Sequence, residues 1–292
     1  MICGFLVLDK PAGPTSHTCV ARVRRAYGLK RVGHGGTLDP AVTGVLPVAL
    51  GPATRLLPYL PGEKAYRAWI QLGVRTTTDD LDGTVLDHQP PPANLTAQTL
   101  NMALAPFRGS IQQRPPSFSA VHVQGQRAYA LARAGHQLHL PPRPVTLHRL
   151  EILAWDRDEG RLELDIHCSS GTYIRSLARD LGESLGCGGA LASLRRTEAL
   201  GFHLHQSVAL DALVPPLPPL LDPLDVLHHL PRHQLTSREE VGWRHGREMA
   251  AHQPWPPDAT VLVVAPDGKL AGLAKPRGQG ELRPHMVFNT DA

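Results

Sequence analysis

Asp39 is the residue whose type and surroundings most suggest chemistry. It is the one acid in the stretch 33–47, which is otherwise rich in Gly, Pro and Thr. The glycines before it allow positive φ and close approach to another molecule, and Pro40 biases Asp39 towards an extended backbone. A carboxylate on such a loop fits a nucleophile, a general base or a metal ligand, and equally an Asp that closes a turn. On loop chemistry alone, the turn is the commoner outcome.

The charge around this loop is uneven. Residues 1–75 hold ten Lys or Arg against three acids, although the whole chain carries a net charge of only +4. A basic segment around a nearly isolated carboxylate is what a catalytic surface that binds a polyanion requires, because phosphate neutralisation supplies most sequence-independent affinity for nucleic acid. A solvated basic face explains the charge equally well.

Metal and disulfide chemistry have weak support. Cys3, Cys19, Cys168 and Cys187 match neither a disulfide framework nor a paired zinc knuckle, so we expect reduced thiols. His167 beside Cys168 could start a metal site, but no further ligand is spaced to complete it. We therefore expect no metal. No apolar run is long enough to span a membrane, and residues 1–10 do not resemble a secretory signal, so we expect a cytoplasmic protein without a membrane partner.

The elements that must position Asp39 follow from apolar periodicity. We expect a strand over 4–9, a helix from Thr15 or Ser16 to Tyr27, and a loop with a short buried piece, rather than a long regular element, over 33–51. Residues 63–74 alternate in period two, which puts Tyr66 on the apolar face.

A second alternating strand is expected over 161–167. The helix that follows Gly171 carries an apolar stripe, with Arg175 in its first turn and off that stripe. Strands and helices mix without a repeating strand–helix rhythm, which favours an α+β fold with a mainly antiparallel sheet.

The C-terminal part reads as a separate small unit. The Pro-dense stretch of about 214–231 has the composition of a linker. Beyond it, 260–264, an Asp267-Gly268 turn, 270–275 and 285–288 predict short strands of a small β domain. We expect two domains, 1–231 and 232–292.

Five sequence blocks, taken in order, resemble the signatures of the TruB-type tRNA pseudouridine synthases of bacteria. They are LDKPAGPTSH at 8–17, GHGGTLDP at 33–40, KAYR at 64–67, GVRT at 73–76 and CSSGTYIRSL at 168–177. The resemblance implies a pseudouridine synthase catalytic domain over 1–231 and a small PUA-like RNA-binding domain over 232–292. It also implies an enzyme that acts on the T-arm of tRNA as a monomer, without guide RNA, metal or cofactor.

The resemblance also assigns roles to residues. Asp39 would be the nucleophile that attacks uridine 55 in a flipped-out nucleotide, with base or sugar as the point of attack left open. Arg175 would orient Asp39, Tyr66 would stack on the uracil and could remove the C5 proton, and His34 would fill the space of the flipped base. The remaining pocket residues implied are Lys10, Tyr173 and Leu194.

Two features depart from the family pattern. Asp79, Asp80 and Asp82 crowd an acidic run whose register is open by one residue, and we expect a structural role for Asp80. The segment 114–144 matches the region that closes over the RNA, but it contains Pro141, Pro142 and Pro144, which leave its mobility open.

Other functions remain as alternatives. A non-catalytic RNA-binding protein or RNA chaperone explains the basic N-terminal quarter, though not the acid within it. A phosphate-handling enzyme would need a Gly-Lys-Ser/Thr ending that the loop lacks. A guide-RNA-dependent relative is disfavoured because the chain has no long Lys-rich extension.

Overall fold

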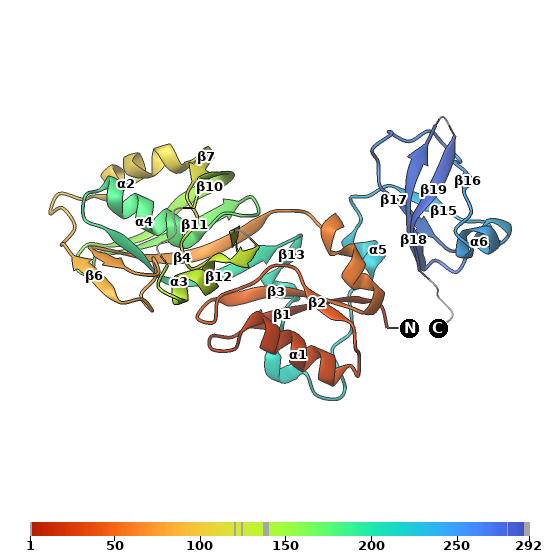
Figure 1. Ribbon diagram of the computed structural model, residues 1–292, viewed down its shortest axis with the longest axis horizontal. Coiled ribbons are helices and arrows are strands. Elements are labelled where there is room, and N and C mark those ends of the chain that lie inside the picture. The colour runs from red at the N-terminus through yellow and green to blue at the C-terminus, as the bar shows by residue number, and fades with distance from the viewer. Residues whose placement is uncertain (1, 120, 124, 137–139, 279, 289–292) are drawn as a thin grey trace.

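A computed structural model describes residues 2–119, 121–123, 125–136, 140–278 and 280–288. Two sheets organise these residues, at opposite ends of an elongated molecule (Figure 1). Within the described residues the larger sheet has the strand order β14-β1-β3-β12-β4-β11-β10-β7, with β2 on β3 and β13 on β12. Its pairings are antiparallel except β1–β14 and β3–β12, which confirms the mainly antiparallel α+β fold.

The strands of the larger sheet are β1 (Gly4–Lys10), β2 (Val32–His34), β3 (Thr43–Leu50), β4 (Lys64–Leu72), β7 (Gly109–Gln113), β10 (Arg143–Asp156), β11 (Arg161–Cys168), β12 (Gly189–Ala199), β13 (Phe202–His203) and β14 (Val208–Ala209). Two hairpins lie outside it: β5 (Val74–Thr76) with β6 (Val85–His88), and β8 (His122–Val123) with β9 (Gln126–Arg127).

Helices cover the sheet in two places. The α-helices are α1 (Ser16–Ala26), α2 (Ala97–Leu104), α3 (Ala128–Arg133), α4 (Ile174–Ser184), α5 (Pro223–Val226) and α6 (Ser237–Arg244), and the 3-10 helices are η1 (Gly51–Tyr59), η2 (Ala105–Phe107), η3 (Leu204–Gln206) and η4 (Leu210–Ala212). Leu100 of α2 and Leu177 of α4 share one core with β4, β10 and β11, whereas α1 packs with β1 and β3 through Val20 and Val23. Asp39 follows β2, between these two cores.

The expected N-terminal elements form with small shifts in their bounds. Thr15 caps α1 by accepting a hydrogen bond from Thr18 N, and Tyr27 ends the helix. The strand expected over 63–74 is β4, and Tyr66 lies on its buried side, as predicted. The strand expected over 161–167 is β11.

One expectation was wrong: residues 43–50 are a regular strand, β3, rather than a loop. Pro47 obscured the strand, because proline donates no hydrogen bond to a ladder. The sheet accommodates it because β12 pairs with β3 only at Thr43 and Gly44. Beyond that point the carbonyl of Pro47 accepts from Gly35 N instead.

The Pro-rich segment also differs from a simple linker. Leu221 forms a bridge with Phe5 at the edge of β1, with N···O distances of 2.8 and 3.0 Å. The hydroxyl of Tyr27 donates to the carbonyl of Pro218 at 2.5 Å. The part of the β1 edge that β14 leaves unpaired offers backbone partners, and Leu221 of the proline-rich chain bonds there before the chain crosses to the second sheet.

The C-terminal sheet has the order β15-β17-β18-β19-β16 in the described residues. Its strands are β15 (Arg232–Gln234), β16 (Met249–Ala250), β17 (Val261–Val264), β18 (Leu270–Arg277) and β19 (Glu281–Val287), which confirms a small C-terminal β domain. Val261 and Val263 face the domain's own core, and Leu262 and Val264 join the core that includes Phe5. The domain is therefore packed against the larger sheet through buried apolar side chains.

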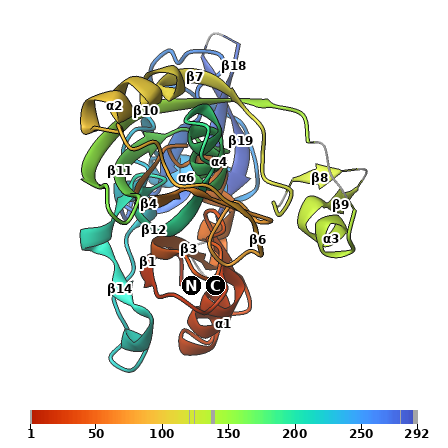
Figure 2. The ribbon, with the colours of Figure 1, turned by 90° about the vertical axis from the view of Figure 1, so that its left-hand side faces the viewer.

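The segment 114–144 leaves the main body. Figure 2 shows α3 with the β8–β9 hairpin set to one side of the larger sheet. Positions 120, 124 and 137–139 of this segment lie outside the described residues, and Pro144 already belongs to β10. In the parts of the chain that the structure describes, none of the helices has the length and apolar character of a membrane span.

Candidate active site

The Asp39 loop presents its carboxylate to solvent from a tightly bonded backbone. Val42 N donates to Asp39 O at 3.1 Å and closes a turn around Pro40. Gly36, at φ +104°, turns the chain out of β2 before this turn. The Asp39 side chain is 49% exposed, so a substrate can reach it.

Two buried side chains fix this backbone from below. The Lys10 ammonium is fully buried and donates to the carbonyls of Pro11, Pro40 and Val42 at 2.8–2.9 Å. Ser16 Oγ donates to Leu38 O at 3.1 Å and accepts from Leu38 N at 2.9 Å. Leu38 and Pro40, the residues before and after Asp39, are therefore both held by hydrogen bonds. Lys10 lies behind the loop, and all three of its N–H donors are used.

Arg175 holds the carboxylate itself. Its Nη2 lies 2.9 Å from Asp39 Oδ2 and also donates to Phe118 O at 2.9 Å, while Nη1 donates to Thr78 O at 3.1 Å. The guanidinium is only 11% exposed. It stands in the first turn of α4, where a cation is disfavoured by the helix dipole, and the neighbouring carboxylates offset that effect.

The acidic run has a defined register in the structure. Asp80 Oδ2 lies 3.7 Å from Arg175 Nη1, and Thr78 Oγ1 donates to Asp80 Oδ1 at 2.5 Å. Asp79 instead pairs with Arg179 at 2.8 Å, one turn further along α4. The geometry therefore puts Asp80 beside the Asp39–Arg175 pair, in addition to any structural role.

A second buried cation lies on the other side of the loop. Arg196 is fully buried in β12, opposite Tyr66 of β4, and donates through Nε to Val45 O at 2.7 Å and through Nη2 to Gly36 O at 3.1 Å. Burial lowers the pKa of Arg196 and of Lys64, and it raises the pKa of Tyr66 against the opposing influence of the Arg196 charge. The Tyr66 phenol is thus a neutral, 6% exposed group in contact with a guanidinium.

The other predicted site residues lie around this centre with different exposure. His34 ends β2, half-buried, with its ring 5.6 Å from that of His17. Tyr173 precedes α4 and packs against Val121 and Ala128, so it connects the site to the 114–144 segment. Leu194 of β12 is half-buried and touches both cores that meet at Asp39.

Sequence reasoning missed Ser16 and Arg196. Ser16 looks like an ordinary residue at a helix start, and Arg196 like one more cation in a basic chain. Neither has a local signal, because their partners lie 22 and 160 residues away. Side-chain burial is what identifies them, and only the folded chain provides it.

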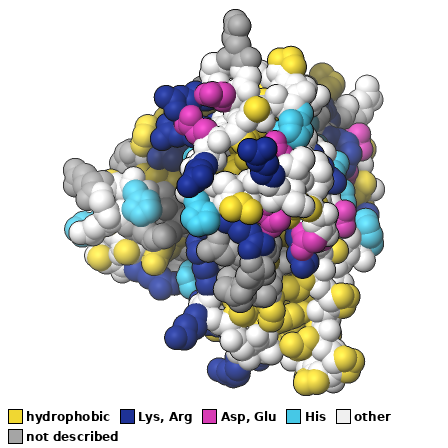
Figure 3. Space-filling view, turned by 90° about the vertical axis from the view of Figure 1, so that its right-hand side faces the viewer, with side chains coloured by type: hydrophobic (Ala, Val, Ile, Leu, Met, Phe, Trp, Pro, Cys, Tyr) yellow, Lys and Arg dark blue, Asp and Glu magenta, His cyan; other side chains and the backbone are white. Residues whose placement is uncertain are grey.

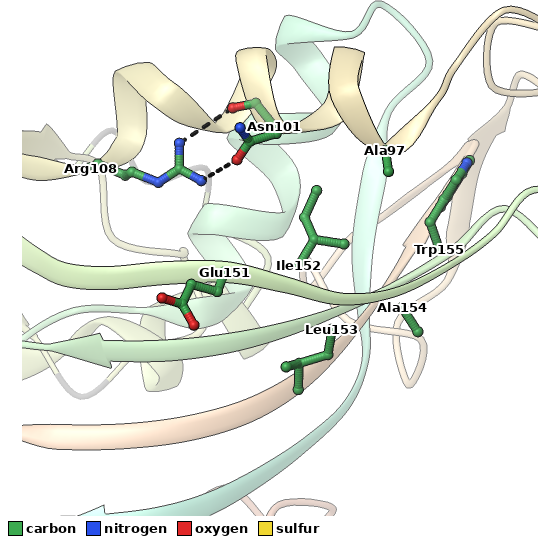
Figure 4. A pocket seen from close by; sticks show the side chains of 8 residues that line it. All are labelled: Ala97, Asn101, Arg108, Glu151, Ile152, Leu153, Ala154 and Trp155. Carbon is green, nitrogen blue, oxygen red and sulfur yellow. Dashed lines mark hydrogen bonds between the residues drawn. The ribbon is translucent and has the colours of Figure 1, made fainter.

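A surface depression away from this centre carries no comparable chemistry. It lies between α2 and β10, has a volume of about 620 Å³, and includes Arg108, whose guanidinium donates twice to Asn101 (Figure 4). Its other side chains are mainly apolar, and Ile152 and Leu153 point to opposite sides of β10. In the described residues, the three side chains that could together hold a metal ion are in the C-terminal domain, away from Asp39.

Family models match two adjoining parts of the chain. One described as TruB family pseudouridylate synthase (N terminal domain) matches residues 24–174, and one described as tRNA pseudouridylate synthase B C-terminal domain matches 175–217.

Curated relatives are similar over nearly the whole chain. A protein named tRNA pseudouridine synthase B from Parasynechococcus marenigrum (strain WH8102) is 62% identical over 98% of this chain and 97% of its own length. One of the same name from Synechococcus sp. (strain WH7803) is 57% identical with the same coverage.

Among solved structures, a chain of an H/ACA RNP bound to a substrate RNA containing 2'-deoxyuridine has a TM-score of 0.71 at 25% identity, covering 98% of this chain and 85% of that one. A chain of a Cbf5-Nop10-Gar1 complex has a TM-score of 0.70 at 25% identity, covering 99% and 86%. With one family model spanning more than half of its residues and relatives matched over almost their full length, the chain belongs to the TruB family of pseudouridylate synthases.

Proposed function

We propose that this chain isomerises uridine 55 in the T-arm of tRNA, with Asp39 as the nucleophile. As a member of its family it is an enzyme that converts uridine to pseudouridine in tRNA. The observation that carries the finer proposal is the Asp39 carboxylate, which is half exposed on a fixed loop and 2.9 Å from the buried Arg175 guanidinium.

The reaction requires a group that attacks and then leaves. The bond from C1' of the ribose to N1 of uracil breaks, the ring turns, and C1' bonds to C5, which loses its proton while N1 gains one. No electrons are gained or lost overall. A carboxylate can add to the nucleotide and depart again, and Asp39 has the exposure for it.

Arg175 keeps the nucleophile in one orientation. Its contacts with Thr78 O, Phe118 O and Asp80 fix the guanidinium independently of Asp39. The carboxylate is therefore held in place before the substrate arrives, which is the geometric condition for an effective reaction.

Tyr66 supports the target uracil from the buried side. Because burial raises the pKa of its phenol, the free enzyme keeps Tyr66 protonated, and stacking is available without any proton transfer. For Tyr66 to accept the C5 proton, the phenolate would need the Arg196 cation beside it, which the cross-strand pair supplies.

The remaining residues have supporting roles. The half-buried His34 fills the space of the flipped nucleotide, Tyr173 and Leu194 line the pocket, and Lys10 positions the loop through its carbonyls.

RNA contact extends beyond the pocket. The exposed side chains of Arg22, Arg24 and Arg25 on α1 provide phosphate contacts, and residues 1–231 act as the catalytic domain. Residues 232–292 act as a PUA-like RNA-binding domain. The enzyme works as a monomer in the cytoplasm, without a guide RNA.

The test uses purified chain and an unmodified tRNA transcript, with pseudouridine located by mass spectrometry. We expect one T-loop uridine to be converted by the wild type, none by Asp39→Asn, and tRNA binding to be retained by this variant. Asp158→Asn, which alters an exposed turn carboxylate, is the matched control and should stay active.

Three outcomes would refute parts of the proposal. A wild type that binds tRNA and makes no pseudouridine would favour an RNA chaperone. Activity that appears only with guide RNA and partner proteins would exclude a stand-alone enzyme, and an active Asp39→Asn would exclude the nucleophile.

A further inference from the structure

His233, Glu239 and His252 meet at one edge of the C-terminal domain. His233 lies in β15, Glu239 in the first turn of α6, and His252 just beyond β16. One ligand atom from each lies within 4.8 Å of the other two. Figure 3 shows this end of the molecule, where histidine side chains lie among basic and acidic ones.

The cluster contains a polar atom without a partner. His233 is only 2% exposed, and its buried Nε2 has no hydrogen-bond partner among the described residues. Burying a hydrogen-bonding group without a partner is unfavourable by about 1–3 kcal/mol, so such an atom calls for an explanation. The neighbouring His252 ring has its centroid 4.2 Å away, so a second imidazole lies within reach of the same ion.

The geometry suits a tetrahedral ion. Ligand bonds of about 2.0–2.1 Å put tetrahedral ligand atoms about 3.3 Å apart. His252 Nε2 and Glu239 Oε1 are already 3.1 Å apart. The His252 side chain is 51% exposed, so a small rotation of its ring can close the remaining separation to His233.

Glu239 can bind an ion without giving up its structural role. Its Oε2 accepts from Thr236 N and Thr236 Oγ1, both at 2.8 Å, and completes the capping box of α6. Its Oε1 makes the contact with His252. One oxygen therefore caps the helix while the other is directed at the cluster.

A similar group elsewhere in the chain lacks these features. His148 and His167 flank Glu63 at 3.6 and 3.2 Å on the surface of β10 and β11, with ring centroids 5.4 Å apart. Both imidazoles are partly exposed, and the three do not converge as the C-terminal group does. This group supplies a natural control.

We propose that His233, Glu239 and His252 bind one divalent transition-metal ion of the zinc type, through two imidazole nitrogens and one carboxylate oxygen. Water takes the fourth position on the side of the exposed His252. Because the ligands come from β15, α6 and the chain after β16, the ion ties these three parts of the C-terminal domain together, and its binding stabilises that domain.

The experiment uses the full chain, stripped of metal with a chelator. Zn²⁺ binding is measured by titration calorimetry, and Co²⁺ is added as a probe with a visible spectrum. The test variant is His252→Gln, because this half-exposed side chain can change without disturbing the core. Glu239→Gln is a second variant, since glutamine also serves in a capping box. His148→Gln is the control.

We expect one Zn²⁺ per chain in the wild type and in the control. Loss of a residue that only supports a metal ligand lowers metal affinity roughly 10–100-fold. Because His252 is itself a ligand in this proposal, its replacement in His252→Gln should lower the affinity for Zn²⁺ by more than that. Zn²⁺ should raise the melting temperature of the wild type and leave that of His252→Gln unchanged. The visible spectrum of bound Co²⁺ should be that of a tetrahedrally coordinated ion and should lack a thiolate charge-transfer band.

Each contrary result overturns the proposal. Absence of stoichiometric binding, or equal binding by His252→Gln and the wild type, removes the site. A thiolate band assigns the ion to one of the four free cysteines instead. Pseudouridine formation is not the readout, so these outcomes are independent of the function proposed above.

Discussion

Lys10→Met tests whether the Asp39 loop is positioned from beneath. The substitution keeps a long, unbranched side chain and removes the three hydrogen bonds to the carbonyls of Pro11, Pro40 and Val42. Each buried acceptor left without a donor is unfavourable by about 1–3 kcal/mol. Pro40 O keeps its bond from Gly13 N. Burial also makes the Lys10 charge unfavourable, which is why its pKa is lowered, and Lys10→Met removes this unfavourable contribution to the free energy of folding.

The net loss should therefore be about 3 kcal/mol in the free energy of unfolding. For a folded unit of this size, that corresponds to roughly 6–12 °C in melting temperature. Displacing the nucleophile by about 1 Å should lower the rate of the chemical step about 100-fold. Because Lys10 is buried and cannot touch the RNA, KM should change little.

The assay measures pseudouridine formation at 25 °C, under single-turnover conditions for the chemical step and under steady-state conditions for KM, alongside thermal unfolding. Lys269→Met is the control, because it makes the same change at a lysine whose side chain is 69% exposed. If Lys10→Met raises KM and leaves the rate intact, Lys10 binds RNA directly. If stability falls and the rate does not, the loop does not depend on this lysine. Either result refutes the reasoning.

Three further predictions concern the same centre. Arg175→Lys loses the fork that reaches Asp39, so the rate should fall about 100-fold, or about 2.7 kcal/mol, while filter binding shows little change in tRNA affinity; an unchanged rate would contradict this. Gly44→Ala places Cβ 2.1 Å from the backbone oxygen of Arg196, whereas Gly13→Ala, at nearly the same φ, meets nothing within 4 Å. Chemical denaturation should therefore show Gly44→Ala to be less stable than Gly13→Ala by about 1–3 kcal/mol. Equal losses of stability in the two variants would exclude the clash. Burial, and to a smaller extent nearby positive charge, lowers the pKa of His34 below its ordinary 6.5, so near and below this pH the unfolded state binds more protons than the folded state and the free energy of unfolding falls as pH drops. Chemical denaturation at about pH 7.5 and 5.5 should therefore show a smaller loss of stability on acidification for His34→Asn than for the wild type. An identical loss in the two proteins would refute this prediction.

Elements with a strong local period were predictable. The alternation through β4 is a property of neighbouring residues, and it located the buried face that carries Tyr66. The hydroxyl cap and glycine stop of α1 are also local signals. The family resemblance, in turn, named residues that the fold brings together, such as Asp39 and Arg175.

What could not be predicted depends on contacts between distant parts of the chain. Lys10 was named as a pocket residue through the family resemblance alone, because nothing near it in sequence reveals its bond to the carbonyl of Val42, 32 residues away. Residues 43–50 looked like a loop because Pro47 has no N–H for a ladder, and its sequence neighbours do not reveal that its carbonyl accepts from Gly35 N. His233, Glu239 and His252 are separated by 6 and 13 residues, a spacing that matches no metal motif, and only the fold of the small domain makes them neighbours.

The arrangement around Asp39 explains why buried cations are tolerated there. Lys10 and Arg196 are removed from water, which is unfavourable for a charge, yet the Lys10 ammonium and the Nε and Nη2 groups of Arg196 donate to backbone carbonyls on the two sides of the Asp39 turn. Charge-assisted hydrogen bonds are stronger and more directional than neutral ones, so they hold a glycine-rich backbone that would otherwise sample many conformations. Ordering such a loop only when RNA binds would consume about 1–2 kcal/mol per residue of binding free energy. Because the protein orders the loop during folding instead, that free energy remains available to extract and turn the target base. Stability and catalysis should therefore fall together when either buried cation is removed.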